Sequence, residues 1–168
     1  MNLESHPTNQ LSGEVTCPGD KSISQRVLMI GSLLNCDIKI SGFLDAEDPN
    51  STMMALNNLG SSIKKDNDIV SISHRSKPFS NPSSCSDLGN SGTGMRLLTG
   101  FISGLNIAAT LTGDDSLSKR PMSRVVDPLT AMGKEISTNS GKAPIQIIGG
   151  NIKDNFEYVM PIASAQVK

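Results

Sequence analysis

The stretch CPGDKSISQR, Cys17–Arg26, joins a turn to the start of a helix. Its proline and glycine are typical of a turn, and either Asp20 or Ser22 can cap the helix that follows. Lys21 then has two interpretations. It is a solvated surface charge, or it adds to the unpaired N–H groups and positive dipole end of the helix and helps to bind an anion. A single copy of the stretch is consistent with both.

A second stretch of the same kind, LGNSGTGMR, lies at Leu88–Arg96. Each stretch leads into a segment whose apolar residues share one helical face. The predicted faces are Ile23, Val27, Ile30 and Leu34 in the first segment and Met95, Leu98, Ile102 and Leu105 in the second. Strand-like residues follow each helix, CDIKISGFL at 36–44 and NIAATLTG at 106–113. The sequence therefore contains an internal repeat.

Each copy continues into a second helix. DPNSTMMALNNLGSSI starts at Asp48, the expected N-cap, and places a proline at the first helical position. Its counterpart RPMSRVVDPLTAMGKEI contains Pro128, and a proline inside a helix predicts a late start or a kink. The β-rich runs DIVSIS and APIQIIGG follow. This order predicts an α/β (α+β) fold in which a helix, a strand, a helix and strands are used twice.

A third copy begins near the C-terminal end of the sequence. MPIASAQVK, 160–168, parallels the first stretch. We expect repeat one at about 14–75, repeat two at about 84–150 and the start of repeat three at about 157–168. Each helix start pairs a small residue with a cation four residues later: Ser22 with Arg26, Gly92 with Arg96, and Ser164 with Lys168. Because residues four apart share a helical face, three such starts can converge on anions in one cleft.

Composition and charge exclude several classes of function. The 168 residues carry 15 basic and 16 acidic side chains, so no basic surface is expected to follow a nucleic-acid backbone. One tyrosine, four phenylalanines and no tryptophan leave few aromatic rings for base stacking. The N-terminal MNLESHPTNQ is unlike a signal peptide, and no apolar run is long enough to span a membrane, which favours a cytoplasmic location.

Metal sites and disulfides are not indicated either. The three cysteines, Cys17, Cys36 and Cys85, are odd in number and widely spaced, which fits neither a disulfide framework nor a zinc site. The two histidines, His6 and His74, lack partners for metal ligation or for a Ser-His-Asp arrangement. We therefore expect no metal and no cofactor.

These motifs resemble the N-terminal part of the 5-enolpyruvylshikimate-3-phosphate (EPSP) synthase family. The resemblance runs from PGDKSISQR through LGNSGTGMR and KRPM to PIASAQVK, in the order and spacing of that family. It implies two lobes, each built from three βαβαββ units in pseudo-threefold arrangement, of which this chain would hold two units and the start of a third. Members are far longer than 168 residues, so the resemblance also implies a fragment.

The resemblance implies an activity and a set of binding residues. The enzyme would transfer the enolpyruvyl group of phosphoenolpyruvate to the 5-hydroxyl of shikimate 3-phosphate and release phosphate, acting as a cytoplasmic monomer when complete. Residues implied to bind shikimate 3-phosphate are Lys21, Ser22, Arg26, Ser164, Ala165 and Gln166. Those implied to bind phosphoenolpyruvate are Lys21, Gly92, Arg120 and Gln166. No catalytic acid or base is recognisable in this part, because the family's proton-transfer residues lie beyond it.

Two alternatives remain open at this stage. The sister family, UDP-N-acetylglucosamine enolpyruvyl transferase, has the same fold but typically carries asparagine where Ser22 stands. A non-catalytic anion-binding module is the second alternative. Gly92 also occupies the position at which glyphosate-tolerant members of one bacterial class of EPSP synthases carry alanine, which leaves inhibitor sensitivity undecided.

Overall fold

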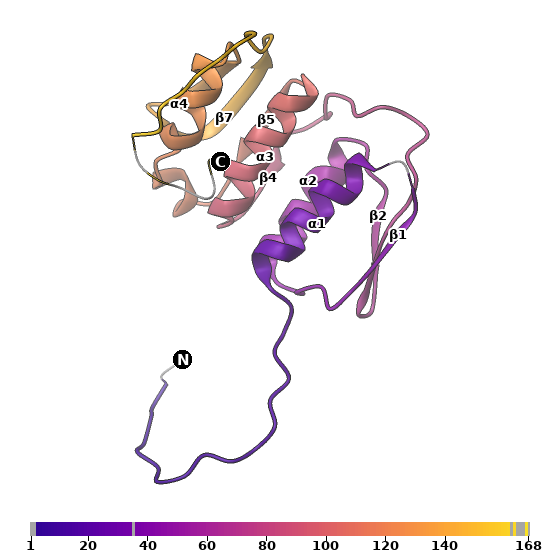
Figure 1. Cartoon of the computed structure of the whole chain (residues 1–168), viewed down its shortest axis with the longest axis vertical. Helices are drawn as coiled ribbons and strands as arrows, with labels where there is room; N and C mark the ends of the chain where they lie inside the picture. The colour runs from indigo at the N-terminus through magenta and orange to yellow at the C-terminus, as the bar shows by residue number, and fades with distance from the viewer. Residues whose placement is uncertain (1–2, 35, 162, 164–166, 168) are drawn as a thin grey trace.

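The computed structural model describes residues 3–34, 36–161, 163 and 167 (Figure 1). The first half contains α1 (Lys21–Leu33), β1 (Ile38–Ser41), α2 (Glu47–Asn58), β2 (Ile63–Asp66) and β3 (Ile69–Ile72). The second half contains β4 (Ser86–Asp87), α3 (Gly92–Leu105), β5 (Ala109–Thr112), the 3-10 helix η1 (Leu117–Lys119), α4 (Ser123–Ala131), β6 (Glu135–Asn139) and β7 (Lys142–Gly149). No helix in the described part of the chain is long and apolar enough to cross a membrane.

The two halves have matching sheets. The first sheet has the order β1-β3-β2, and the second has β4-β5-β7-β6. In both sheets the last strand of the unit lies between two others, the strand that follows the first helix and the strand that follows the second helix. It runs antiparallel to both of them. Ile72 lies opposite one residue on each flanking strand, and Ile147 does the same in the second sheet. The predicted α/β fold is confirmed.

The first copy departs from the implied βαβαββ unit at its start. In the second copy β4 precedes α3 and pairs in parallel with β5. Residues 3–20 contain no strand, and they run away from the two sheets as an extended segment (Figure 1). Leu11 and Val15 in this segment are almost fully exposed. Within the described residues the first copy therefore begins with a helix.

Helix α3 of the second half lies beside the helices of the first half (Figure 1). Three of its four predicted apolar residues are fully buried, and the fourth, Leu105, is partly buried. Met95, Leu98 and Ile102 are fully buried in the hydrophobic core. Ser91 caps the helix by accepting a hydrogen bond from the Gly94 N–H at 3.2 Å. These core residues join the two copies into one hydrophobic core, because α3 contacts α1 and α2 as well as α4, β5 and β7.

The predicted apolar face of α1 is wrong. Ile23 and Ile30 are 69% and 59% exposed, whereas Gln25, Leu28 and Ser32 are buried. The three buried positions correspond in the repeat to Met95, Leu98 and Ile102 of α3. Packing in the repeat thus decides which side of α1 faces inward, and it overrides the apolar periodicity of this one segment.

Helices α2 and α4 do not start where the sequence predicts. Asp48 is not the N-cap of α2, because the helix already begins at Glu47 and Ala46 is in the N-cap position without a side-chain bond. Asp48 lies instead in the first turn, where its carboxylate is free to form an ion pair. Helix α4 begins at Ser123 and contains Pro128 in its interior, so the helix does not start late enough to place this proline in its first turn.

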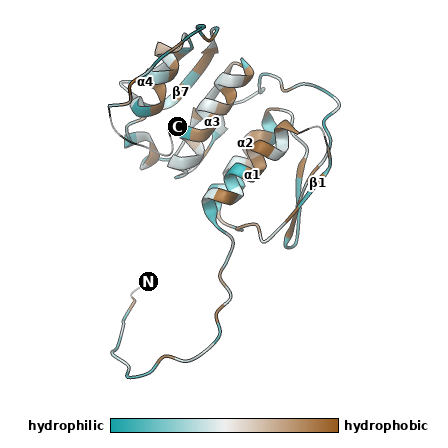
Figure 2. Ribbon diagram, viewed as in Figure 1, coloured by the Kyte–Doolittle hydropathy of each residue, from teal (hydrophilic) through white to brown (hydrophobic). Residues whose placement is uncertain are grey.

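An exposed apolar strip on α1 should make the chain associate with itself. The strip comprises Ile23, Ile30, Leu33 and Leu34, and the helix changes from hydrophilic in its first turns to hydrophobic further along (Figure 2). We expect Ile30→Lys to lower self-association measured by sedimentation velocity, because it removes apolar surface from the contact. The midpoint of thermal unfolding should change by no more than about 2 °C, since Ile30 is outside the core.

Leu28→Ala on the buried side of α1 is the matched control. Leu28 is fully buried, so this variant should lose about 2–5 kcal/mol of stability. Equal self-association of the wild-type chain and Ile30→Lys at the same concentration would contradict the prediction.

Candidate functional site

A polar cleft of about 440 Å³ lies where three helix starts meet the loop after η1. Helices α1, α2 and α3 each contribute residues from their first turns. The cleft is lined by Lys21, Asp48, Asn90, Gly92, Thr93, Arg96 and Arg120. Three of the side chains are cationic and one is a carboxylate, so the lining carries an excess of positive charge. The cleft is therefore suited to a small anion.

Lys21 reaches the cleft from the first turn of α1. Asp20 accepts a hydrogen bond from the Ile23 N–H at 2.7 Å, which resolves the capping question in favour of Asp20. The Lys21 Nζ atom lies 2.9 Å from the Asp48 Oδ2 atom. About half of the Lys21 side chain is exposed, and a solvated ion pair of this kind contributes little stability. Lys21 can therefore exchange the carboxylate for an anionic ligand at low cost.

Gly92 lets two arginines approach the start of α3. A Cβ atom at this position would lie 3.0 Å from the Arg120 Nη1 atom and 3.3 Å from the Arg96 Nη1 atom. Both distances are tighter than ordinary contacts. The absence of a side chain thus keeps space at the point where both guanidinium groups and the helix dipole are closest together.

Arg120 is held by a short chain of hydrogen bonds. It donates to the Asn90 Oδ1 atom, and the Asn90 Nδ2 atom donates to the Asp114 Oδ2 atom at 2.9 Å. Hydrogen bonds from the Leu117 N–H and from Asn90 keep the pKa of Asp114 below its usual range. A neutral amide therefore stands between Arg120 and the carboxylate. This arrangement orients Arg120 without pairing its charge directly, which keeps the charge available to a ligand.

Arg96 contributes a second guanidinium from one turn inside α3. Its Nη1 atom donates to the Gly92 carbonyl at 3.3 Å, and its Nη2 atom donates to the Pro121 carbonyl at 3.2 Å. Burial, followed by repulsion from Arg120 and Arg124, lowers the pKa of Arg96. Arginine starts from so high a pKa that it stays charged. A bound anion would reduce the repulsion between like charges that are held this close.

The predicted site residues fall into three groups. Lys21, Gly92 and Arg120 lie together in the cleft. Ser22 and Arg26 lie on α1 but do not line it. The Arg26 Nη1 atom donates to the Ser22 carbonyl at 3.3 Å, the same contact that Arg96 makes with Gly92. The predicted residues Ser164, Ala165 and Gln166 lie outside the described residues.

Sequence reasoning missed Asp48, Asn90 and Thr93 as members of the cleft. Arg96 was expected at an anion-binding helix start, because it repeats the position of Arg26, but it was not assigned to either substrate. Asp48 was explained as a helix cap, and that explanation hid its ion pair with Lys21. Asn90 gave no signal, since its role depends on Arg120 and Asp114, both distant in the sequence.

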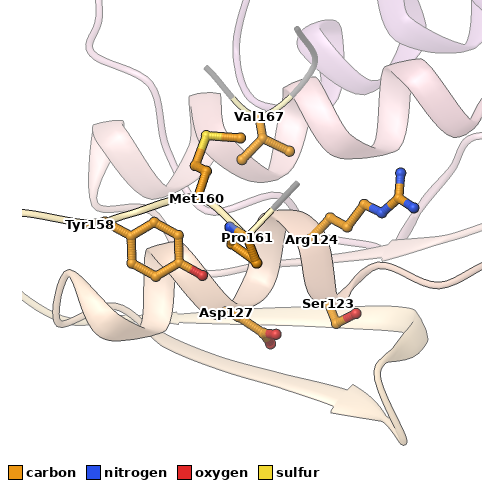
Figure 3. A pocket seen from close by; sticks show the side chains of 7 residues that line it. All are labelled: Ser123, Arg124, Asp127, Tyr158, Met160, Pro161 and Val167. Carbon is orange, nitrogen blue, oxygen red and sulfur yellow. The ribbon is translucent and has the colours of Figure 1, made fainter. Parts of the chain in front are cut away.

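A second hollow of about 240 Å³ lies between α4 and the C-terminal segment (Figure 3). Tyr158, Met160 and Pro161 lie over Asp127 and Ser123 of α4, and the Arg124 side chain extends away from Asp127. The hollow contains neither Lys21 nor the residues of α3 that line the polar cleft. It therefore does not extend the anion site.

Comparison with known proteins assigns the family. A sequence model described as EPSP synthase (3-phosphoshikimate 1-carboxyvinyltransferase) matches residues 5–168. Proteins named 3-phosphoshikimate 1-carboxyvinyltransferase are 48% identical in Ruthia magnifica, over 96% of this chain, and 46% identical in Petrotoga mobilis, over 100% of it. This chain spans 38% and 40% of the lengths of those two proteins.

A solved structure supports the same assignment. The EPSP synthase of Acinetobacter baumannii at 2.37 Å superposes with a TM-score of 0.83 and 41% sequence identity, covering 93% of this chain and 36% of that protein. Fold, motifs and sequence agree across nearly the whole chain. The chain therefore belongs to the EPSP synthase family.

Proposed function

We propose that this chain is the N-terminal part of a 3-phosphoshikimate 1-carboxyvinyltransferase. The complete enzyme, meaning this chain followed by the C-terminal part that its relatives carry, transfers the enolpyruvyl group of phosphoenolpyruvate to the 5-hydroxyl of shikimate 3-phosphate. The observation that carries the proposal is the convergence of Lys21, Arg96 and Arg120 around Gly92. Both substrates are small polyanions, which a cleft with excess positive charge attracts.

Each part of the cleft has a role in this reaction. Phosphoenolpyruvate lies at the start of α3, with Arg120 and Gly92 in contact with it. Lys21 lies between the two substrates, and shikimate 3-phosphate extends along α1 to Ser22 and Arg26. Ser164, Ala165 and Gln166 are proposed to complete its binding from the third repeat, with Gln166 near both ligands.

The reaction adds and then removes one proton. The methylene carbon of phosphoenolpyruvate takes a proton while the hydroxyl oxygen of the acceptor bonds to the neighbouring carbon and gives up its own proton. The resulting tetrahedral intermediate loses a methyl proton and inorganic phosphate, which restores the double bond in the product. Positioned acids and bases are required for these steps. They are proposed to come from the C-terminal part, and neither a metal nor a cofactor takes part.

The repeat boundaries are part of the same proposal. Repeat one covers about residues 14–75, repeat two about 84–150, and repeat three starts at about 157–168 and continues in the C-terminal part. The complete enzyme is proposed to be a cytoplasmic monomer. The match to the sister enzyme that acts on UDP-N-acetylglucosamine is weaker, because Ser22 stands where that family typically has asparagine.

The test is an assay of phosphate release by the complete enzyme. Phosphate should be released from phosphoenolpyruvate when shikimate 3-phosphate is the acceptor and not when UDP-N-acetylglucosamine is. The opposite acceptor preference would assign the sister activity. No release with either acceptor, combined with binding of inorganic phosphate, would support a non-catalytic anion-binding module instead.

Gly92→Ala should weaken the binding of glyphosate more than the binding of phosphoenolpyruvate. In this family glyphosate occupies the phosphoenolpyruvate site, and it is the longer molecule. A methyl group at residue 92 would lie 3.0 Å from Arg120 and 3.3 Å from Arg96, so both guanidinium groups must shift by a few tenths of an ångström. The inhibition constant should therefore rise by about tenfold or more and the Michaelis constant by less, each measured in the complete enzyme. Equal rises in the two constants would contradict this steric argument.

A further inference from the structure

Gln25 is a fully buried polar residue at the junction of α1, α2 and α3. Its Nε2 atom lies 2.9 Å from the Ser91 Oγ atom, 3.0 Å from the Thr52 Oγ1 atom and 3.3 Å from the Asp48 carbonyl oxygen. Ser91 is the N-cap of α3, and the other two residues lie in the first half of α2. One amide group thus ties α1 to two segments that are distant in the sequence, α2 and the start of α3.

The orientation of this amide is fixed by its partners. The Asp48 carbonyl oxygen can only accept, so the Gln25 side chain must present its N–H groups to it. The Gln25 Oε1 atom is buried and finds no donor among the residues that the structure describes. A buried carbonyl without a donor costs free energy, and this cost offsets part of what the Nε2 hydrogen bonds contribute, so stability alone does not explain glutamine at this position.

The internal repeat shows that packing does not require glutamine either. Position 25 corresponds to Met95 in the second copy, where an unbranched apolar side chain is fully buried at the same point of the helix. Met95 fills the position without tying α3 to other segments by side-chain hydrogen bonds. Glutamine at residue 25 adds such a tie, and the tie involves the three helix starts that form the polar cleft.

This tie connects the helices that carry the cleft residues. Lys21 lies one turn before Gln25 on α1, Asp48 offers its carbonyl to Gln25 and its carboxylate to Lys21, and Gly92 directly follows Ser91. The packing here is close, because a Cβ atom at Gly94 would lie 3.0 Å from the Gln25 Nε2 atom. A change in the Gln25 contacts would therefore shift α1 against α3 and move Lys21 relative to Gly92.

We infer that Gln25 is a positioning residue that sets the distance between Lys21 and the start of α3 for the reaction. The inference rests on the proposed function. Gln25 does not line the cleft, and it acts on the substrates through Lys21 and Gly92. Small displacements of groups that hold reacting molecules lower the rate strongly, so the role is kinetic and separable from stability.

The main test is Gln25→Met in the complete enzyme, a substitution that the second repeat already contains. We expect kcat/KM for phosphoenolpyruvate to fall by about tenfold or more, while the thermal midpoint stays within about 2 °C of the wild type or rises. Thr52→Val keeps the shape of its side chain and removes one of the three oxygen partners, and it should cause a smaller fall of the same kind. It also provides an answer if Gln25→Met does not fold.

Ser32→Ala is the matched control. Ser32 lies on the same buried side of α1, has a hydroxyl group without a described partner, and does not line the cleft. Its kinetic constants should equal those of the wild type. Wild-type kcat/KM in both Gln25→Met and Thr52→Val would overturn the inference, as would losses that only follow the loss of thermal stability in all three variants.

A phosphate titration separates this inference from the proposed function. If the wild-type enzyme releases no phosphate with either acceptor, the proposed function fails and binding decides the role of Gln25. The probe is inorganic phosphate, added to the 168-residue chain while the amide signals of Gly92 and Thr93 are followed by NMR. Weaker binding in Gln25→Met by about tenfold supports positioning of the anion site, and equal binding overturns it.

Discussion

Lys21→Ala in the complete enzyme should lower kcat/KM by about 30-fold to 5,000-fold, which corresponds to roughly 2–5 kcal/mol for truncating one partner of a charge contact. The Lys21 Nζ atom lies 2.9 Å from the Asp48 carboxylate, and both residues line the polar cleft. Without Lys21, Asp48 would face the bound anions as an unpaired negative charge. The loss therefore combines a missing attraction with a new repulsion.

The fold should survive this change. Lys21 is at the surface end of α1, where Asp20 caps the helix independently of it. Thermal unfolding of the variant should therefore match the wild type within about 2 °C. Lys119→Ala is a suitable control, because Lys119 is exposed, precedes Arg120 directly and does not line the cleft. A wild-type kcat/KM in Lys21→Ala would refute the assignment of Lys21 to the substrate site.

The order of helices and strands could be predicted because the sequence contains it in two copies. Turn residues, helix starts and β-rich runs recur in both copies, so each copy supports the interpretation of the other. Helix α3 shows the agreement best, since three of its four predicted apolar residues, Met95, Leu98 and Ile102, are fully buried and Leu105 is partly buried.

The buried side of α1 was not predictable from its own periodicity. Ile23 and Ile30 form a regular apolar strip, yet they are exposed, whereas Gln25 is buried. The repeat position of Gln25 carries the better information, because Met95 occupies that position in the second copy. Tertiary packing inherited by both copies thus outweighs the local pattern, and a polar residue remains inside where it ties helix starts together.

The cleft was predictable only in part, for a similar reason. Lys21, Gly92 and Arg120 could be identified because each belongs to a short motif. The hydrogen-bonded chain that holds Arg120 could not, since it runs from Asn90 to Asp114 across the fold and no local pattern marks it. Motifs identify residues that contact ligands, whereas the residues that support them depend on tertiary contacts.

The 168-residue chain by itself should release no phosphate from phosphoenolpyruvate and shikimate 3-phosphate. Among the described residues that line the cleft, Asp48 is the one carboxylate, and it is paired with Lys21. Anions bound at Gly92 and Arg120 would also be open to water, and water and salt weaken each charge contact. The positive charge of the cleft is therefore insufficient for turnover unless the C-terminal part closes the other side of the cleft.

Adding the C-terminal part as a separate chain should restore phosphate release, because the exposed apolar strip on α1 offers surface for association. The measurement compares phosphate release by the 168-residue chain, by the C-terminal chain and by their mixture. Activity should rise with the concentration of the second chain and saturate, and Lys21→Ala in the first chain should lower the saturating rate by about 30-fold or more. Ile30→Lys should shift the titration to higher concentrations of the second chain, because it removes apolar surface from the contact. Turnover by the 168-residue chain alone at the rate of the mixture would show that proton-transfer groups lie within residues 1–168, and it would overturn their proposed origin in the C-terminal part.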